Sequence, residues 1–144
     1  MMPSSAIEGI YDTVCIHVDT AAGGLTPNDT LHEPAFRRLK GGRLEDLAPD
    51  GMDRRVHIEY AGTAAWHKLG HMQTFGVTVR VGYFAGEHRE ATLATIADDE
   101  HLIGAALMFS PNWVGAALIV GPANVIKHGD DCFILEIPVD IQLA

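Results

Sequence analysis

The amino-acid sequence predicts an α+β domain in which helices pack on one face of an antiparallel sheet of about four strands. Three observations lead to this fold class. Apolar residues recur at helical spacing in two segments, they alternate with polar or small residues in three later segments, and turn-forming residues separate these stretches. The length of 144 residues suits a single domain over 1–144, and 47% hydrophobic with 20% charged residues is typical of a globular chain.

The N-terminal helix is predicted directly after Ser4 and Ser5. Ser5 and Glu8 have the spacing of a capping box, in which the two side chains bind backbone amides of the first turn. Alternating apolar residues over 14–18 fit a strand equally well, so the far end of this segment stays open between helix and strand. The apolar residues at helical spacing are Ile7, Ile10, Tyr11, Val14 and Val18.

A long loop region is predicted over 19–54, because glycine, proline, asparagine and aspartate cluster there without a helix or strand period. An ordered loop of this length in a compact domain usually serves binding or assembly. Its aromatic and basic residues favour a contact with a partner subunit, and an ordinary solvated loop is the alternative. The interface residues predicted in this loop are Phe36, Arg37, Arg38 and Arg43.

Two antiparallel strands are predicted next, at 56–60 and 73–84, where valine, isoleucine and aromatic residues alternate with polar or small ones. We expect the connector between them to protrude as an extended loop. Trp66, His67 and His71 lie in this connector, and we assign them to the same interface.

The main helix is predicted over 88–109, and Pro111 stops it. Two forms are compatible with the acidic residues in its middle. The helix is either continuous or divided by a kink at which Asp98 caps a second segment. Its apolar face consists of Leu93, Ile96, Ile103 and Leu107.

The C-terminal part is predicted to close the sheet. Short strands are expected at 117–120 and 124–127, and a longer one at 133–141 follows a turn at 128–131. Pro138 has no amide proton to donate to a neighbouring strand, so we expect a sheet edge or a bulge at this position.

The net charge of −9 comes from 10 Lys and Arg residues against 19 Asp and Glu residues. This excludes a protein that holds nucleic acid on a basic surface. Residues 1–89 contribute −2 and residues 90–144 contribute −7. The last third is therefore expected to present an acidic surface, formed by Asp98, Asp99, Glu100, Asp130 and Asp131.

The two cysteines, Cys15 and Cys132, lie far apart and form no C-x-x-C pair, which favours reduced thiols that contribute to packing in a reducing compartment. No stretch reaches the roughly 18 to 20 apolar residues of a membrane span, and the first residues lack the pattern of a signal peptide. We therefore expect a soluble, unexported protein.

Catalytic motifs are absent from the sequence. It contains no G-x-x-x-x-G-K-S/T loop, no G-x-G-x-x-G turn and no G-x-S-x-G elbow, so we expect neither enzyme activity nor a cofactor. His67 and His71 have the i, i+4 spacing of two metal ligands on a helix. A small metal-dependent enzyme is therefore the alternative, with Glu59, Asp53 or Cys132 as the third ligand.

From Arg54 onward the sequence resembles the tail terminator (tail completion or neck) proteins of long-tailed bacteriophages and related phage-like particles. The resemblance covers about two thirds of the chain and is one of architecture: in that family an N-terminal helix and a loop region precede a hairpin, a helix and a final hairpin. The segments that carry it are RVHIEY at 55–60, QTFGVTVRV at 73–81, ATIADD at 94–99 with Leu102, Ile103 and Leu107, and FILEIPVDI at 133–141.

The resemblance implies a homo-oligomeric ring, usually hexameric, that caps the tail tube, ends its polymerisation and joins it to the head–neck connector. It implies a virion protein of the tail or neck that is assembled in the cytoplasm of the host bacterium, with DNA passing through the ring without specific binding. The 19–54 region has no counterpart in this resemblance. Another neck or capsid-associated structural protein on the same fold is an alternative.

Overall fold

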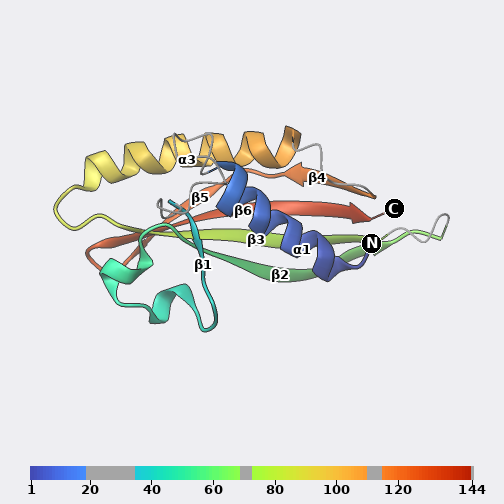
Figure 1. Cartoon of the computed structure of the whole chain (residues 1–144), viewed down its shortest axis with the longest axis horizontal. Coiled ribbons are helices and arrows are strands. Elements are labelled where there is room, and N and C mark those ends of the chain that lie inside the picture. Colours follow the sequence, from blue (N-terminus) through green and yellow to red (C-terminus); the bar gives the residue numbers. More distant parts are fainter. Residues whose placement is uncertain (19–34, 69–72, 110–114, 144) are drawn as a thin grey trace.

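A mixed, curled sheet of six strands forms the centre of the protein (Figure 1). The computed structural model describes residues 1–18, 35–68, 73–109 and 115–143. Three long antiparallel strands lie in the middle, a two-residue strand pairs in parallel with one of them, and two short strands lie end to end along the far edge. The strands are β1 (Arg37–Arg38), β2 (Arg55–Trp66), β3 (Gln73–Phe84), β4 (Ala116–Val120), β5 (Asn124–His128) and β6 (Cys132–Leu143), in the order β1-β2-β3-β6 with β4 and β5 both on β6.

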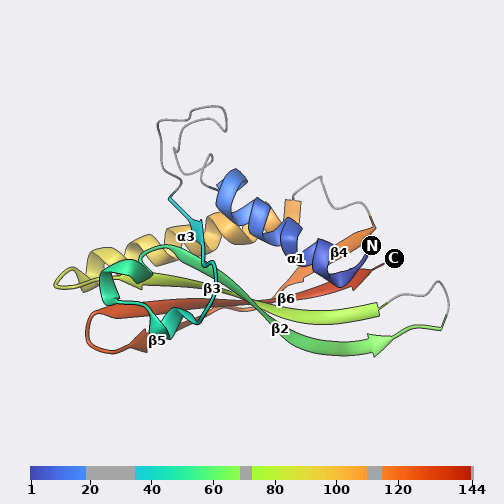
Figure 2. The ribbon, with the colours of Figure 1, turned by 60° about the horizontal axis from the view of Figure 1, so that its bottom comes forward.

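Helices cover one face of this sheet (Figure 2). α1 (Pro3–Asp12) continues into a π-helical segment, Thr13–Val18, which packs against one flank of α3 (Arg89–Phe109). α3 lies over β3, β4 and β6, whereas α1 contacts β2. The two helices thus divide the helical face between the two sides of the sheet.

The main core lies between these helices and the sheet. Every second side chain of β3 and β6 points into it, as in the paired residues Phe75 and Ile141. Burial of this apolar surface supplies the main stabilisation of the fold, at roughly 25 cal/mol for each Å² removed from water. The sequence period of two over 73–84 and 133–141 follows from this one-sided burial.

The predicted α+β class is confirmed, and the predicted sheet is corrected in size and type. The sheet is mixed and has six strands, because β1 adds in parallel to β2 and the segments 116–120 and 124–128 share one edge of β6. The connector after residue 60 is strand as far as Trp66, so β2 is longer than predicted. α3 is continuous, and no kink divides it at Asp98.

The start of the chain also differs from its prediction. Met2 is the N-cap of α1 and makes no side-chain cap, while Pro3 and Ser5 already lie within the helix. The capping box of Ser5 and Glu8 is therefore wrong. Proline is favoured in the first helical turn, where its missing amide proton has no partner to lose. The open question over 14–18 is resolved in favour of helical structure.

Pro138 lies opposite a break between β4 and β5, and its pairing with Thr78 of β3 continues the register without a bulge. β6 has β3 on one side, and on the other side β4 ends at Val120 and β5 begins at Asn124. The backbone of Pro138 points toward this break, where its carbonyl accepts a hydrogen bond of 2.8 Å from the amide of Gly121. Pro138 has no amide proton to donate toward this side of β6. Because no strand pairs with β6 at the break, no hydrogen bond between strands is lost there.

Part of the predicted loop covers the second face of the sheet. Two short 3-10 helices, Leu44–Asp46 and Pro49–Met52, pack there on the start of β6. Cys132 lies in this small apolar cluster, and neither Cys132 nor Cys15 is in a disulfide, as predicted. Residues 19–34 of the predicted loop lie outside the described residues.

Candidate assembly surfaces

Large exposed apolar side chains lie along two opposite sides of the sheet. The first, which we call the β2 side, consists of the outer edge of residues 60–66 and the neighbouring basic residues of 37–43. The second, which we call the β4–β5 side, consists of the outer edges of β4 and β5 and the flank of α3 above them. Tyr60 and Trp66 belong to the β2 side; Leu93, Met108, Phe109, Ile119, Val125 and Ile126 belong to the β4–β5 side.

The β2 side is an open strand edge over part of its length. β1 covers only Arg55 and Val56, and the amide of Ile58 donates a hydrogen bond of 2.8 Å to the Tyr11 hydroxyl. From residue 60 to 66, no other strand of the described structure pairs with this edge. An uncovered edge of this kind is a template for a strand of another chain.

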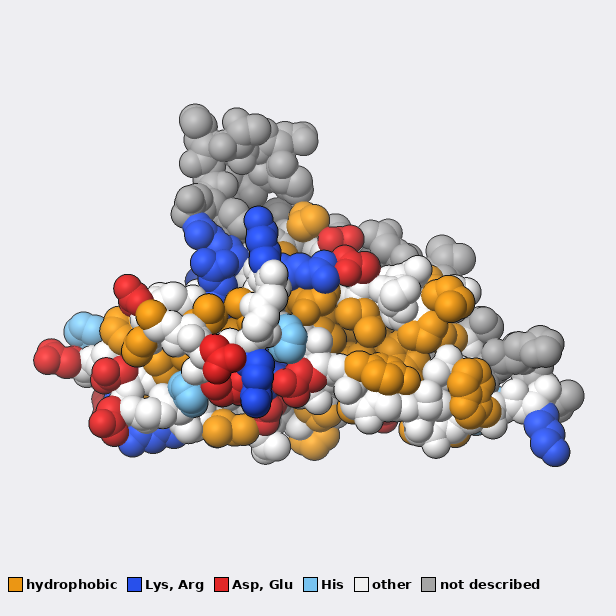
Figure 3. Space-filling model, turned by 90° about the horizontal axis from the view of Figure 1, so that it is seen from below, with side chains coloured by type: hydrophobic (Ala, Val, Ile, Leu, Met, Phe, Trp, Pro, Cys, Tyr) orange, Lys and Arg blue, Asp and Glu red, His pale blue; other side chains and the backbone are white. Residues whose placement is uncertain are grey.

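The aromatic residues of this edge are available for a contact. Trp66 is 72% exposed at the end of β2, and the Tyr60 ring lies 5.8 Å from the ring of buried Phe75. Figure 3 shows this side, with hydrophobic side chains gathered over one half of it and a group of Lys and Arg side chains beside them. The placement of Trp66 is compatible with its predicted interface role, which stays a prediction.

The basic residues predicted at the interface have different roles in the fold. The Arg38 guanidinium binds both oxygens of Glu8, at 2.6 and 2.8 Å, and stacks on the Tyr11 ring at 3.8 Å. Arg38 therefore holds β1 to α1, and Arg37 is only partly exposed. Arg43 is largely exposed and lies 3.6 Å from Glu45.

Phe36 is a correction to the predicted interface. Its side chain is fully buried in the main core, with the Arg54 guanidinium 5.2 Å from its ring. β1 turns Phe36 inward beside β2, so this aromatic residue contributes to folding and cannot contact a partner. A loop composition of aromatic and basic residues does not distinguish the two roles, because burial depends on where the loop is anchored.

The β4–β5 side includes a flank of α3 that is also apolar. At about 100° per residue, Leu93, Ala97 and Met108 lie about 80 to 140° around the helix from Ile103 in the buried face of α3. They point away from the opposite flank, where Leu102 and Ala106 pack into the core. α3 is therefore apolar on two faces, and only one of them is covered by the described structure.

A shallow hollow of about 480 Å³ lies on this flank. Small residues in the middle of α3 form its floor, and Met108, which is 60% exposed, borders it. The hollow is lined by Ala97, Glu100, His101, Gly104, Ala105, Met108 and Phe109.

Most of the predicted acidic residues are exposed. Asp98 and Glu100 lie on the surface of α3, and Asp130 and Asp131 form the exposed turn between β5 and β6. Glu100 lines the flank of α3 on the β4–β5 side and the turn 130–131 follows β5, whereas Asp98, four residues before Leu102, lies on the other flank of α3. The acidic residues of the last third are therefore divided between two parts of the surface.

Asp99 is a correction to the predicted acidic surface, because it is only 2% exposed. The Arg54 guanidinium binds its two oxygens at 3.1 Å each, and the Tyr83 hydroxyl donates a hydrogen bond of 2.9 Å. Burial raises the pKa of Asp99, against the effect of these two partners. Asp99 therefore fastens α3 to β3 and the chain before β2.

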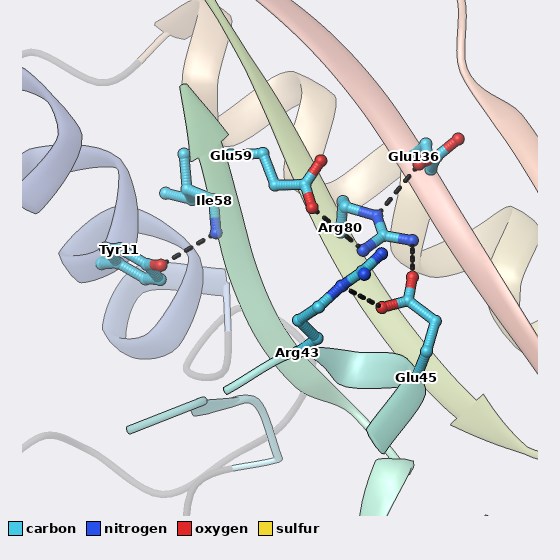
Figure 4. Close-up of polar contacts among 7 residues, drawn as sticks. All are labelled: Tyr11, Arg43, Glu45, Ile58, Glu59, Arg80 and Glu136. Carbon is cyan, nitrogen blue, oxygen red and sulfur yellow. Dashed lines mark hydrogen bonds and ion pairs between the residues drawn. The ribbon is translucent and has the colours of Figure 1, made fainter. Parts of the chain in front are cut away.

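The charged cluster around Arg80 was not predicted from the sequence (Figure 4). On the second face of the sheet, the Arg80 guanidinium donates to Glu45, to Glu59 at 3.3 Å and to Glu136 at 3.0 Å. The hydrogen bond from Arg80 lowers the pKa of Glu45 to about 2. The only signal was a single arginine among the valines of 73–84, a position that alternation alone assigns to solvent.

Only one member of the predicted metal-binding histidine pair lies within the described residues. His67 follows β2, and its ring nitrogen Nε2 lies 3.2 Å from the Thr74 hydroxyl. His71 lies outside the described residues. Across ranges 1–18, 35–68, 73–109 and 115–143, no three His, Cys, Asp or Glu side chains are grouped to hold a metal ion.

No protein-family model matches the chain, and a comparison with curated proteins finds no significant match. Among the described residues, no helix is both long enough and apolar enough to span a bilayer.

Proposed function

We propose that this protein is a structural, non-catalytic assembly protein that forms a homo-oligomeric ring and ends a phage-type tail. In this role the ring caps the tube formed by the tail tube protein and stops its polymerisation. The surface of the ring that does not contact the tube binds the head–neck connector protein. The ring acts in the tail or neck of the virion after assembly in the host cytoplasm.

The observation that carries this proposal is the distribution of exposed apolar side chains on two different, opposite sides of one sheet. A monomeric protein rarely exposes large apolar patches without an interaction to cover them. Two different sides that contact each other give a head-to-tail interface, and repetition of such an interface closes a ring when the rotation permits. A single self-complementary patch gives only a dimer.

The charge distribution supports passage of DNA without binding. Asp98, Glu100, Asp130 and Asp131 are exposed in one copy, and those that the contact between copies leaves uncovered recur around the axis of a ring. Carboxylates along a lumen repel phosphate, so they do not retain the DNA that passes.

The size of the purified protein in solution tests this proposal. We expect mass photometry and negative-stain imaging to show annular particles, either with the protein alone or after addition of its tail tube protein. Higher salt is expected to preserve them, because each copy carries −9 and screening weakens repulsion between copies. A protein that stays monomeric at every salt concentration, even beside its tail tube, contradicts the proposal.

A further inference from the structure

The register of the sheet shows that the open edge of β2 and the strand β4 lie at the same level on opposite sides. Reading across the sheet, Trp66 pairs with Gln73, Gln73 with Leu143, and Leu143 with Ala116. At the other end of the open edge, residue 60 connects through β3 and β6 to residue 120 in the same way. Segment 60–66 and β4 (116–120) therefore cover the same stretch along the strand direction, on opposite sides of the sheet.

The strand directions are also compatible with pairing. β2 is antiparallel to β3, β3 is antiparallel to β6, and β6 is antiparallel to β4. If a second copy is placed beside the first with its sheet continuing in the same sense, its β2 runs antiparallel to β4 of the first. Antiparallel addition at an open edge satisfies the unpaired backbone groups of both strands.

Apolar side chains of the two sides lie level with each other at both ends of segment 60–66, Tyr60 with Val120 and Trp66 with Ala116. Trp66 is level with Ala116, which follows the end of α3 where Met108 and Phe109 border the hollow. The hollow of about 480 Å³ is large enough for an indole ring.

Charged residues match at the opposite end of the sheet. Arg38 of β1 pairs with Val56 of β2, and the pairing continues from Val56 across β3 and β6 to Val125 of β5. The turn beyond β5 carries exposed Asp130 and Asp131. The turn lies just beyond the His128–Cys132 pair, three residues along β6 from Leu135, so basic groups of one copy lie at the same end of the contact as acidic groups of the next.

We propose that the partner of the β2 side is the β4–β5 side of a second copy of this chain. Segment 60–66 pairs antiparallel with β4 of the neighbour, and Trp66 is seated against the α3 hollow. The inference rests on the proposed ring and adds which surfaces meet, in which direction and through which side chain.

A complementation experiment with two double variants tests this contact. Tyr60→Lys/Trp66→Lys disrupts the β2 side, and Met108→Lys/Ile119→Lys disrupts the β4–β5 side. All four side chains are more than half exposed, so each variant is expected to fold. Each variant alone is expected to be monomeric at 15.5 kDa, because it lacks one of the two surfaces that every contact needs.

The mixture of the two variants gives the decisive result. Each variant retains the surface that the other has lost, so an equimolar mixture is expected to form a one-to-one dimer of twice the monomer mass and nothing larger. Phe84→Lys is the matched control, because Phe84 is an exposed aromatic residue of β3 that belongs to neither side. We expect this control to assemble as the wild type does.

Two results overturn the inference while leaving the ring intact. Either double variant still forms wild-type particles, or both are monomeric and their mixture stays monomeric. A wild type that never assembles contradicts the proposed function itself and is seen before any variant is made.

Discussion

The two faces of the sheet are stabilised in different ways. The helical face is a continuous apolar core, in which β3 and β6 side chains pack against α1 and α3. The second face has a small apolar cluster at one end and the Arg80 cluster in the middle, and no helix of the described ranges covers its other end (Figures 2 and 4). The same strand, β3, contributes to both faces, so substitutions within it separate the contribution of packing from that of charge.

The largest effect is expected on the helical face. Phe75→Ala removes a fully buried ring from the main core and should lower the free energy of unfolding by about 3 to 5 kcal/mol. Phe84→Ala, in the same strand but exposed, should lower it by less than about 1 kcal/mol. Chemical denaturation of both variants measures the difference, and equal losses contradict the assignment of the core to this face.

A smaller loss is expected on the second face. Arg80→Ala leaves Glu45, Glu59 and Glu136 close together without the cation that binds all three. We expect the free energy of unfolding to fall by about 2 to 3 kcal/mol. This is less than for a fully buried ion pair, because the three carboxylates are partly exposed. Glu59→Gln is the matched control, with a loss of less than about 0.5 kcal/mol, because this side chain is the most exposed of the three.

The pH dependence of Arg80→Ala sharpens the same test. Arg80 lowers the pKa of Glu45 from 4.5 to about 2 in the folded state, so this contribution is complete above pH 4.5 and is lost as the pH falls toward 2. In Arg80→Ala, protonation should instead relieve repulsion among the carboxylates. Acidification across this window is therefore expected to destabilise the wild type more than the variant, and parallel curves contradict the role of the cluster.

An intermediate effect is expected where α3 joins the sheet. Tyr83→Phe removes the hydroxyl that donates to Asp99 at 2.9 Å and should cost about 1 to 2 kcal/mol. The hydrogen bond from Tyr83 lowers the pKa of Asp99 against the effect of burial, so the pKa of Asp99 should rise further in the variant. Carboxyl NMR titration detects this rise, and an unchanged pKa argues that Tyr83 acts only by packing.

Cys132→Ala tests the small apolar cluster of the second face. Cys132 is buried and its thiol lies 3.7 Å from the Pro49 carbonyl, so we expect a loss of about 1 kcal/mol with or without reductant. The wild-type thermal midpoint should likewise be insensitive to reductant. Stabilisation of the wild type by several kcal/mol on removal of reductant would reveal a disulfide.

The smallest effect is expected at Arg38. Arg38→Ala breaks an ion pair with Glu8 that is largely exposed, and such pairs contribute little because water and salt screen them. We expect a thermal midpoint close to that of the wild type. A large drop in isolated monomer would show that the stacking of Arg38 on Tyr11 anchors β1.

Local periodicity in the sequence was sufficient for the long elements. The strands at 73–84 and 133–141 and the helix over 88–109 are found within a few residues of their predicted positions, because one-sided burial imposes its period on consecutive residues. The turn at 128–131 and the break in strand pairing opposite Pro138 follow from residue chemistry that acts over a few positions.

Contacts between distant residues were decided only by the tertiary structure. Three arginines donate hydrogen bonds to acidic residues that are distant in the sequence: Arg38 to Glu8, Arg54 to Asp99 and Arg80 to Glu136, over separations of 30, 45 and 56 residues. Phe36 is buried for the same reason, because β1 anchors its segment beside β2. The sequence by itself determined α3 and the two central strands β3 and β6, since their periods depend on neighbours along the chain. Segment 61–66 and β1 are strand because they pair with β3 and β2, and that pairing is tertiary. Whether a given arginine, aspartate or phenylalanine faces solvent, a partner or the core depends on which segments the fold brings together, and no local pattern encodes that.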